Sequence, residues 1–331
     1  MSQSVLFILG GAGFIGHETV TEAVKAGWQV KALVRSEEKA ENIRQLGAQA
    51  VLGDIARPEG WANEARGARV LIDLVQPKLP RRLTRAAIQT VSTERQIITG
   101  KIIAALGSFP VEERPVLFSI SGADDLQPDA QKRISHLSPL RKDPCGFAFI
   151  GIPIRKLIEQ SGLDATYIYL GNIVYGPGKI FADRYVKALA KGAAFVVGQG
   201  TNHLPLSEVT DVARALVHLA GLPRPAIVQQ TFLVMDGSTT TQRELLDETA
   251  SLMGVKPARA LPSWLAALVA GQIAVDTVTL EALANPSALL ATGFRFDSPS
   301  HREGVPRALA RMGYPPSAAS QKRLAEDSSH T

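Results

Sequence analysis

The stretch that determines the fold lies within the first sixteen residues, where an apolar run meets closely spaced glycines: Val5-Leu6-Phe7-Ile8-Leu9-Gly10-Gly11-Ala12-Gly13-Phe14-Ile15-Gly16. The run 5–9 has the length and composition of a buried strand. From Phe14 to Ala26 apolar residues recur at helical spacing, and Gly27 ends that segment. We therefore predict a strand, a glycine turn and a helix.

The glycines predict a binding site for a pyrophosphate. They satisfy two overlapping spacings, Gly11-x-Gly13-x-x-Gly16 and Gly10-x-x-Gly13-x-x-Gly16. In either spacing, glycine permits the tight turn, lets the backbone approach the phosphates and lets the helix pack closely on the strand. The start of the helix then offers free N–H groups to the anion. The alternative is a tight turn without a ligand. The predicted cofactor-binding residues of this loop are Gly10, Gly11, Gly13, Phe14, Ile15 and Gly16.

The residues after the second and third predicted strands indicate which dinucleotide is bound. Arg35 and Ser36 stand where an acidic residue would hold a ribose 2′-hydroxyl. An arginine there can pair with a 2′-phosphate, which favours NADP, with NAD kept as the second choice. A solvated surface arginine is the alternative. Asp54 and Ile55 are expected near the adenine, although an Asp just past a strand is also a common turn former.

Strand and helix patterns alternate through the first half of the chain. Strands are predicted at 5–9, 29–34, 50–52, 70–75, 115–121 and 165–170, and helices at 14–26, 37–46, 83–106 and 151–160. This alternation is typical of an α/β fold with a doubly wound parallel sheet of the Rossmann type. We therefore assign residues 1–170 to an NAD(P)-binding Rossmann domain, with 121–144 as an irregular loop crossing the site entrance.

The second half of the chain has shorter elements. We expect a smaller, mostly helical substrate-binding lobe over 171–316, with a turn at 175–178 and helices near 181–191, 211–220, 241–253 and 263–275. A strand near 231–235 is expected to return to the main sheet, so the lobe and the first domain are interleaved in sequence. The polar tail 317–331 is expected to be disordered.

Composition restricts the class of protein. Of the 331 residues, 45% are hydrophobic and 20% charged, as expected of a globular chain with a large core. Cys145 is the single cysteine, which excludes an intramolecular disulfide and a cluster of cysteine metal ligands and favours a reducing compartment. No secretory leader precedes the first strand, and the most apolar helical segment, 264–275, is shorter than the roughly 20 residues that span a bilayer. We expect a cytoplasmic protein without a membrane span or metal site.

The formal net charge of +5 is distributed along the chain, apart from Arg81, Arg82 and Arg85 near a predicted helix start. A nucleic-acid interface would need a denser basic surface interleaved with stacking aromatic residues, so we exclude that partner. We interpret the three arginines as a solvated helix end. Attraction for an anionic cofactor is the alternative.

Several motifs together resemble the extended short-chain dehydrogenase/reductase superfamily, whose members include NAD-dependent epimerases, dehydratases and carbonyl reductases. The resemblance covers most of the chain, from Val5 to about Gly313. Its landmarks are the glycine loop 10–16, Gly53-Asp54, the strand end 118–121, the turn 174–178, and the segment 209–215 that follows Gly198-Gln199-Gly200. The resemblance implies the Rossmann fold and a nicotinamide cofactor.

Catalysis in that superfamily uses a Ser or Thr at the end of the fifth strand, a Tyr, and a Lys four residues after the Tyr. The resemblance places Ser121 in the first role, polarising a substrate carbonyl. It places Phe147 at the tyrosine and Gly151 at the lysine, and a shift by two residues gives Phe149 and Pro153. The chain therefore looks like an atypical member without the dyad. Phe147→Tyr with Gly151→Lys is expected to restore the hydroxyl and ammonium near the nicotinamide.

Three functions remain open after the loss of the dyad. The first is an oxidoreductase, because hydride transfer needs mainly proximity and another group can supply the proton. The second is a noncatalytic NADP sensor or scaffold of the NmrA type, which resembles this chain in its cofactor loop. The third is a redox-neutral isomerase or cyclase. Replacement proton donors could be sought among His136, Cys145, Tyr175, Tyr185 and His203, each of which is also readily structural or solvated.

The substrate side departs from nucleotide-sugar enzymes. His203 stands where those enzymes often have an arginine, and Leu170-Gly171 replaces the expected Arg-Pro. We therefore expect a small, fairly apolar carbonyl-type substrate, as in secondary metabolism, and we keep a homodimer open. An apolar cleft lining would fit such a substrate, but for most of the candidate residues we favour a core role, and Trp264 is the one to test as a cleft residue. The candidate lining residues are Trp264, Leu265, Leu268, Val269, Phe181 and Phe195.

Overall fold

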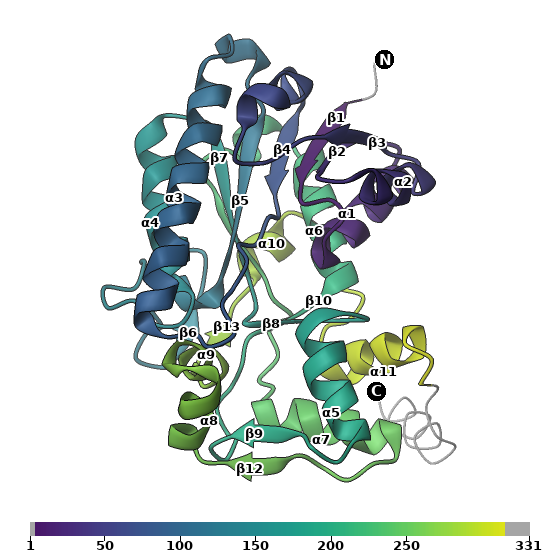
Figure 1. The fold of residues 1–331 in the computed structure, drawn as a ribbon, viewed down its shortest axis with the longest axis vertical. Coiled ribbons are helices and arrows are strands. Elements are labelled where there is room, and N and C mark those ends of the chain that lie inside the picture. The colour runs from purple at the N-terminus through teal and green to yellow at the C-terminus, as the bar shows by residue number, and fades with distance from the viewer. Residues whose placement is uncertain (1–3, 315–331) are drawn as a thin grey trace.

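The computed structural model describes residues 4–314, and its centre is a seven-stranded parallel sheet (Figure 1). The strand order β11-β7-β5-β4-β1-β2-β3 reverses direction at β1, which confirms the doubly wound fold. The predicted strand 165–170 has the observed bounds of β7. The strands are β1 (Val5–Leu9), β2 (Gln29–Val34), β3 (Gln49–Leu52), β4 (Val70–Asp73), β5 (Val116–Gly122), β7 (Ala165–Leu170) and β11 (Thr231–Val234).

Helices cover both faces of the sheet because each central strand is apolar on both faces. In β1, Leu6 and Ile8 face one core with helices α1 (Phe14–Lys25), α2 (Glu37–Gln45) and α6 (Val209–Gly221). Phe7 and Leu9 face the other core with helices α3 (Arg85–Gly107) and α4 (Ala148–Ser161). Figure 1 shows these two helical layers on either side of the strands.

The chain beyond β7 builds a second, smaller core, in which Tyr175, Phe181, Leu245 and Val305 are buried together. Two two-stranded parallel pairs, β8 with β10 and β9 with β12, connect its segments, and a third pair, β6 with β13, packs on the main core. The strands are β6 (Arg133–Ile134), β8 (Ile173–Tyr175), β9 (Phe195–Val197), β10 (Leu206–Glu208), β12 (Arg259–Leu261) and β13 (Leu283–Ala284). The helices are the π-helix η5 (Ile180–Val186), α5 (Lys187–Ala190), α7 (Gln242–Met253), α8 (Ser263–Ala270), α9 (Gln272–Val278), α10 (Ser287–Ala291) and α11 (His301–Arg311).

Short 3-10 turns complete the described chain. They are η1 (Pro58–Gly60), η2 (Ala62–Ala65), η3 (Val111–Glu113), η4 (Ala123–Asp125) and η6 (Arg224–Ala226). The edge strand β11 comes from the second half of the sequence and pairs with β7 along Thr231–Val234. The first half of the chain therefore supplies six strands of the main sheet and the second half supplies the seventh.

Two helix predictions are wrong in their bounds for reasons of tertiary contact. The predicted helix 263–275 is two helices, α8 and α9, separated at Gly271, whose φ is 92°. A Cβ at Gly271 would lie 2.3 Å from the Leu83 carbonyl oxygen, so the chain bends where it meets a distant segment. Helix α4 begins at Ala148 rather than 151, because the Asp124 carboxylate accepts the N–H of Phe147 at 2.9 Å and orders the preceding turn.

Within residues 4–314, no helix combines the length and apolar character that crossing a bilayer requires. The predicted disordered tail 317–331 lies outside the described residues.

Candidate cofactor and active site

The predicted site residues follow the carboxyl ends of neighbouring parallel strands. Gly10 follows β1, Arg35 follows β2, Asp54 lies two residues past β3, and Ser121 lies at the end of β5. In a doubly wound sheet this edge is where ligands bind, at the point where the strand order reverses. The structure therefore brings these residues to one edge of the sheet, with β1 at its centre.

The glycine loop is closed by backbone contacts. Gly10 has a φ of 81°, and its carbonyl oxygen accepts the N–H of Gly13 at 2.9 Å. A Cβ at Gly16 would lie 2.1 Å from that same oxygen, and one at Gly11 would lie 2.7 Å from Cβ of Ala32. A Cβ at Gly13 would meet only the Gly10 oxygen, at 3.1 Å. The loop is therefore packed on its inner side and open at Gly13, a shape that fits a pyrophosphate.

Phe14 and Ile15, which we predicted as cofactor-binding residues, are half-buried. A Cβ at Gly178 would lie 2.8 Å from the Phe14 ring, and one at Gly176 would lie 3.3 Å from it. The ring therefore packs on the turn after β8, while Ile15 packs against the core under α1. Phe14 is thus a contact between the glycine loop and the second half of the chain.

The other predicted cofactor residues lie on exposed turns. Arg35 is exposed, and within residues 4–314 no ion pair of its guanidinium occurs. Ser36 is the N-cap of α2, and its hydroxyl accepts the Lys39 N–H at 3.5 Å. The Asp54 carboxylate accepts the N–H of Ala56 at 3.0 Å, so it stabilises its own turn, and Ile55 packs on the core beside α3. Arg35 is therefore the charged group of this set that is free to meet a ligand.

A hydrogen-bonded Ser–Asp pair lies at the end of β5. The Ser121 hydroxyl donates to Oδ2 of Asp125 at 2.7 Å. Asp125 is 1% exposed, and its Oδ1 has no hydrogen-bond partner among the described residues. Burial raises the pKa of the Asp125 carboxyl well above its usual range, against the opposing effects of the Ser121 hydrogen bond and of the charges on Arg155 and Arg141. Asp125 therefore keeps a proton to higher pH than an exposed aspartate.

Gly151 lies directly against this pair. A Cβ at Gly151 would be 2.2 Å from both the Ser121 hydroxyl oxygen and Oδ2 of Asp125. The Asp125 carboxylate and the Ser121 hydroxyl therefore occupy the position that the Cβ of any other residue at 151 would take. A lysine at position 151 would have to displace the Asp125 carboxylate and the Ser121 hydroxyl, so the expectation that Gly151→Lys together with Phe147→Tyr restores a dyad stays a prediction that requires this rearrangement. Phe147 itself lies at the start of α4, where its N–H is held by Asp124.

Asp124 joins three segments beneath the site. Its carboxylate accepts the Phe147 N–H at 2.9 Å, the Asn172 side-chain amide at 2.6 Å and the Thr277 hydroxyl at 3.1 Å. Burial raises the pKa of Asp124, and the three donors oppose the rise. The start of α4, the connection after β7 and helix α9 are therefore fixed to the end of β5 by one carboxylate.

Arginines flank the two aspartates. The Arg155 guanidinium donates to the Tyr169 hydroxyl at 3.1 Å and lies 3.5 Å from the centroid of the Tyr167 ring. Arg141 donates its backbone N–H to the Asp125 carbonyl and its Nε to the Asp124 carbonyl. Sequence reasoning missed the two aspartates and both arginines. The adjacent acids directly after the Ser121 strand end were the available signal.

Two of the side chains considered as replacement proton donors, Tyr175 and His203, have other partners, and burial raises the pKa of three of them. Tyr175 is fully buried and donates to the Ser300 carbonyl at 3.4 Å, and burial raises its pKa. Burial also raises the pKa of Tyr185 to about 12. His203 Nδ1 lies 2.7 Å from Oε1 of Glu281. Burial raises the pKa of the Cys145 thiol. Within residues 4–314, no hydrogen bond connects these side chains or His136 to Ser121 or Asp125.

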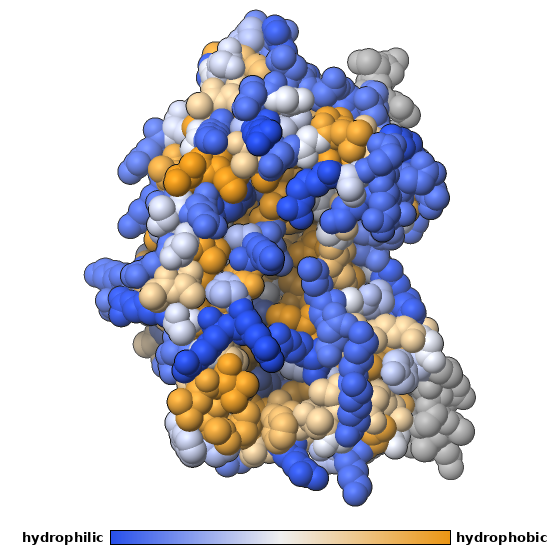
Figure 2. Space-filling view, in the orientation of Figure 1, coloured by the Kyte–Doolittle hydropathy of each residue, from blue (hydrophilic) through white to orange (hydrophobic). Residues whose placement is uncertain are grey.

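The residues considered for an apolar lining divide between the core and the surface. Phe181 is fully buried in the core around Tyr175, which is the core role that we favoured for most of these residues. Leu265 is half-buried and Phe195 is exposed. Trp264, Leu268 and Val269 are 67%, 57% and 72% exposed on α8. Figure 2 shows apolar side chains gathered over that helix on the outer face of the molecule.

Gly171, which stands in place of an expected proline, is fixed by packing. A Cβ there would lie 2.5 Å from the Pro205 carbonyl oxygen. The segment that leads into β10 therefore passes too close for any side chain at position 171.

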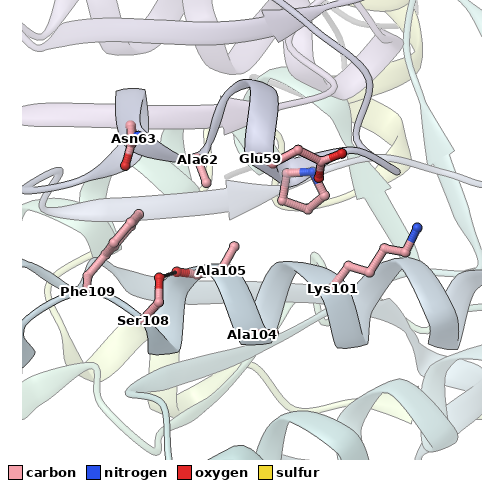
Figure 3. A pocket seen from close by; sticks show the side chains of 9 residues that line it. Glu59, Ala62, Asn63, Lys101, Ala104, Ala105, Ser108 and Phe109 are labelled. Atoms are coloured by element: carbon pink, nitrogen blue, oxygen red, sulfur yellow. Dashed lines mark hydrogen bonds between the residues drawn. The ribbon is translucent and has the colours of Figure 1, made fainter.

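A groove of about 440 Å³ lies elsewhere, between α3 and the turns η1 and η2. Figure 3 shows Glu59 and Lys101 toward one end and Phe109 toward the other. Phe109 follows the end of α3 and precedes β5, so the groove extends toward the amino ends of the strands. Ser121 and Asp125 are not among its lining residues. The groove is therefore separate from the candidate active site.

Comparison with known proteins agrees with this geometry. Residues 10–219 match the sequence model of a family described as NAD(P)H-binding. The structure is similar to the crystal structure of human epimerase family protein SDR39U1 with NADPH, with a TM-score of 0.75 and 18% identity over 92% of this chain and 99% of that chain. The family model establishes that the chain is NAD(P)H-binding, and the structural similarity shows that the two proteins share one fold.

Three curated relatives carry different names. Ceramide reductase of Caulobacter vibrioides is 24% identical over 92% of this chain and 90% of the relative. Photosystem II assembly factor Ycf39 of Guillardia theta is 31% identical over 76% of this chain and 71% of the relative. The 4-hydroxy-2-methyl-3-oxo-4-farnesyl-3,4-dihydroquinoline-1-oxide ketoreductase of Stigmatella aurantiaca is 31% identical over 48% of this chain, and the match spans 45% of that protein. With Ycf39 of Trieres chinensis, at 38% identity, the match spans 21% of the relative.

Proposed function

Since this chain belongs to the NAD(P)H-binding family, we propose that it binds NADP and reduces a carbonyl group of a small, fairly apolar molecule. Gly10, Gly11, Gly13 and Gly16 would hold the pyrophosphate, and Arg35 would pair with the 2′-phosphate. When bound, the dinucleotide supplies a hydride at C4 of the nicotinamide. The remaining requirement is a group that stabilises the carbonyl oxygen and provides a proton.

The observation that carries the proposal is the Ser121–Asp125 hydrogen bond of 2.7 Å at the end of β5. Ser121 would donate its hydroxyl hydrogen to the substrate oxygen as negative charge develops there. Asp125, whose pKa burial raises, would in its protonated form return a proton to the serine oxygen and then take one from solvent. The carbonyl carbon thus gains a hydride, its oxygen gains a proton, and the protein returns to its initial state.

Two relatives support a reductase with an apolar substrate. Their names describe reduction of ceramide and of a farnesyl-bearing quinoline oxide. For this chain, His203 stands where nucleotide-sugar enzymes often have an arginine, which argues against a nucleotide sugar as the substrate.

The proposal is tested by mixing the full chain with NADPH and ketones of increasing apolar character while NADPH oxidation is followed. Asp125→Asn and Ser121→Ala are each expected to lower kcat about 100-fold or more, as for loss of a general acid, without changing NADPH affinity by calorimetry. Asp129→Asn, at an exposed aspartate of the same loop, is the matched control and is expected to leave kcat unchanged. Equal turnover by wild type and both site variants would contradict the proposal.

The pH dependence has a defined sign. The proposed acid must be protonated, so the wild-type rate is expected to fall as pH rises through the raised pKa of Asp125, and Asp125→Asn is expected to lose that dependence. The contribution of Asp125 to the free energy of unfolding is also expected to fall as pH rises. A carboxyl whose pKa is raised in the folded state favours folding most at low pH, and this contribution is lost as pH rises. Unfolding of both proteins across the pH range measures that difference.

A noncatalytic NADP-binding scaffold or sensor is the second candidate. Phe147 and Gly151 at the dyad positions favour it, and one relative is named as an assembly factor. On this alternative, the full chain binds NADPH by calorimetry and oxidises none of it with any ketone of the series.

A further inference from the structure

Helix α8 presents an apolar surface that the rest of the described chain does not cover. Trp264, Leu268 and Val269 are each more than half exposed, and Ala266 is the residue that the helix buries. Ser263 is the single polar side chain between Pro262 and Gly271. Removing such a patch from water is favourable, so an uncovered group of this kind marks a surface that meets a partner.

Two basic segments lie next to this helix, one before it in the sequence and one in backbone contact with its carboxyl end. Segment 76–93 contains Lys78, Arg81, Arg82 and Arg85 and no acidic residue, and segment 249–275 contains Lys256, Arg259 and no acidic residue. All six cations are exposed, and none forms an ion pair within residues 4–314. Leu79 in the first segment is also exposed. The positive charge is therefore available to an external anion.

The backbone fixes the two segments against each other. Leu83 donates its N–H to the Ala270 carbonyl at 2.8 Å and accepts the N–H of Ile273 at 3.2 Å. Gly271 has no room for a side chain at this contact. The arginines at 81 and 82 are consequently carried beside the carboxyl end of α8. Figure 2 shows hydrophilic side chains next to the apolar group over α8.

We propose that α8 and the basic segments 78–85 and 256–259 form a docking surface for the anionic face of a lipid bilayer. Trp264, Leu268 and Val269 enter the boundary between head groups and acyl chains, as an apolar helix face with a tryptophan does. The basic side chains contact anionic head groups around it. The helix lies on the bilayer and does not span it, because α8 has eight residues. A nucleic acid would leave the apolar side chains uncovered.

Flotation with vesicles tests this surface on the full chain. Wild type is expected to float with vesicles of phosphatidylcholine and phosphatidylglycerol, to remain in solution with phosphatidylcholine alone, and to be released by high salt. Leu268→Gln with Val269→Gln, and separately Arg81→Glu with Arg82→Glu, are each expected to reduce the bound fraction at least tenfold. Unaltered thermal unfolding and NADPH affinity show that each variant is folded.

Matched controls alter similar residues on other surfaces. Ile97 and Val111 are 58% and 70% exposed, and Ile97→Gln with Val111→Gln is expected to leave flotation unchanged. Lys156→Glu with Arg302→Glu, at two exposed cations on α4 and α11, is the charge control. If the controls release the protein as strongly as the α8 and arginine variants, the binding is nonspecific and the proposal is wrong.

Trp264 also reports its own environment. Of the three tryptophans, Trp61 is buried, Trp28 is half-buried and Trp264 is exposed. Anionic vesicles are expected to shift the tryptophan fluorescence emission to shorter wavelength, because Trp264 leaves water. Trp264→Phe is expected to abolish the shift and keep flotation, because the apolar ring remains. A concentration-dependent dimer that Leu268→Gln with Val269→Gln abolishes, without vesicle binding by wild type, would assign the surface to a second copy and overturn the proposal.

Discussion

The loop after β1 and the loop after β5 lie at the same edge of the sheet but are built from different parts of the chain. After β1, the carbonyl of Gly10 contacts Gly13 and Gly16, so backbone atoms define the shape. After β5, the side chains of Ser121 and Asp125 define it, and Gly151 from another helix makes room for them. A phosphate-binding loop made of backbone atoms can therefore be predicted from glycine spacing. The Ser121–Asp125 site cannot be predicted in this way, because folding brings its side chains together.

The loops after β1 and β5 also differ in whether the steric clash of an added methyl group can be removed by a second substitution. An added methyl at Gly16 meets a backbone oxygen that cannot move without altering β1. An added methyl at Gly151 meets a carboxylate and a hydroxyl, which other substitutions can remove. We therefore expect the largest loss of stability for a substitution at Gly16 in the glycine loop. At Gly151, beside Ser121 and Asp125, we expect a loss that a second substitution can reverse.

Gly16→Ala is expected to have the largest effect. Its Cβ would lie 2.1 Å from the Gly10 oxygen, and we expect a loss of about 3 kcal/mol in the free energy of unfolding by overpacking. NADPH affinity should fall with it, because the loop must open. Gly100→Ala in α3 is the control, since a Cβ there meets nothing within 4 Å and is expected to stabilise by about 0.5–1 kcal/mol. Denaturant unfolding of both variants checks the contrast. Equal stabilities would show that the loop is not packed as described.

Gly151→Ala is expected to cost about 1–3 kcal/mol, because it overpacks the Ser121–Asp125 pair. In the background of Asp125→Ala the cost should be smaller, since the closer carboxylate oxygens are gone. A double-mutant cycle on unfolding free energies measures this coupling. Additive effects would mean that Gly151 and Asp125 are not in contact, and the account of the absent lysine would fail with them.

Arg35→Ala is expected to have the smallest effect of the three. Loss of one exposed charge-assisted contact to a 2′-phosphate corresponds to about a tenfold weaker affinity for NADPH, or about 1.4 kcal/mol, with NADH affinity unchanged. Arg302→Ala on α11 is a control at another exposed arginine. Calorimetric titration with NADPH and with NADH gives the ratio of the two affinities. An unchanged ratio would remove the 2′-phosphate assignment and leave the glycine loop intact.

The strands and most helices could be predicted because their signals are local. The apolar run 165–170 and the glycine at the end of α1 are sequence features, and the observed elements follow them closely. The errors arise where a distant segment intervenes. Leu83 breaks the predicted helix 263–275 at Gly271, and Asp124 orders the start of α4 at Phe147. Neither contact leaves a periodic pattern in the sequence.

The candidate site was predicted in part for the same reason. Ser121 and the positions of Phe147 and Gly151 could be placed by resemblance, and the structure brings Gly151 against Ser121. Asp125 was missed because its importance comes from burial and from a glycine on another helix. The sequence left both a site role and a structural role open for Tyr175 and Phe181, and the structure buries both side chains in the second core. Exposure of an aromatic side chain is a tertiary property.

The position of β11 at the edge of the main sheet has a consequence for how the polypeptide can be divided. Thr231–Val234 pairs with β7 along its length, so a fragment ending at Leu170 would leave the N–H and C=O groups of one side of β7 without their partners. Such a fragment would present an apolar open edge and would be prone to associate with itself through strand pairing. Folding studies and truncations of this protein should therefore keep both halves on one chain.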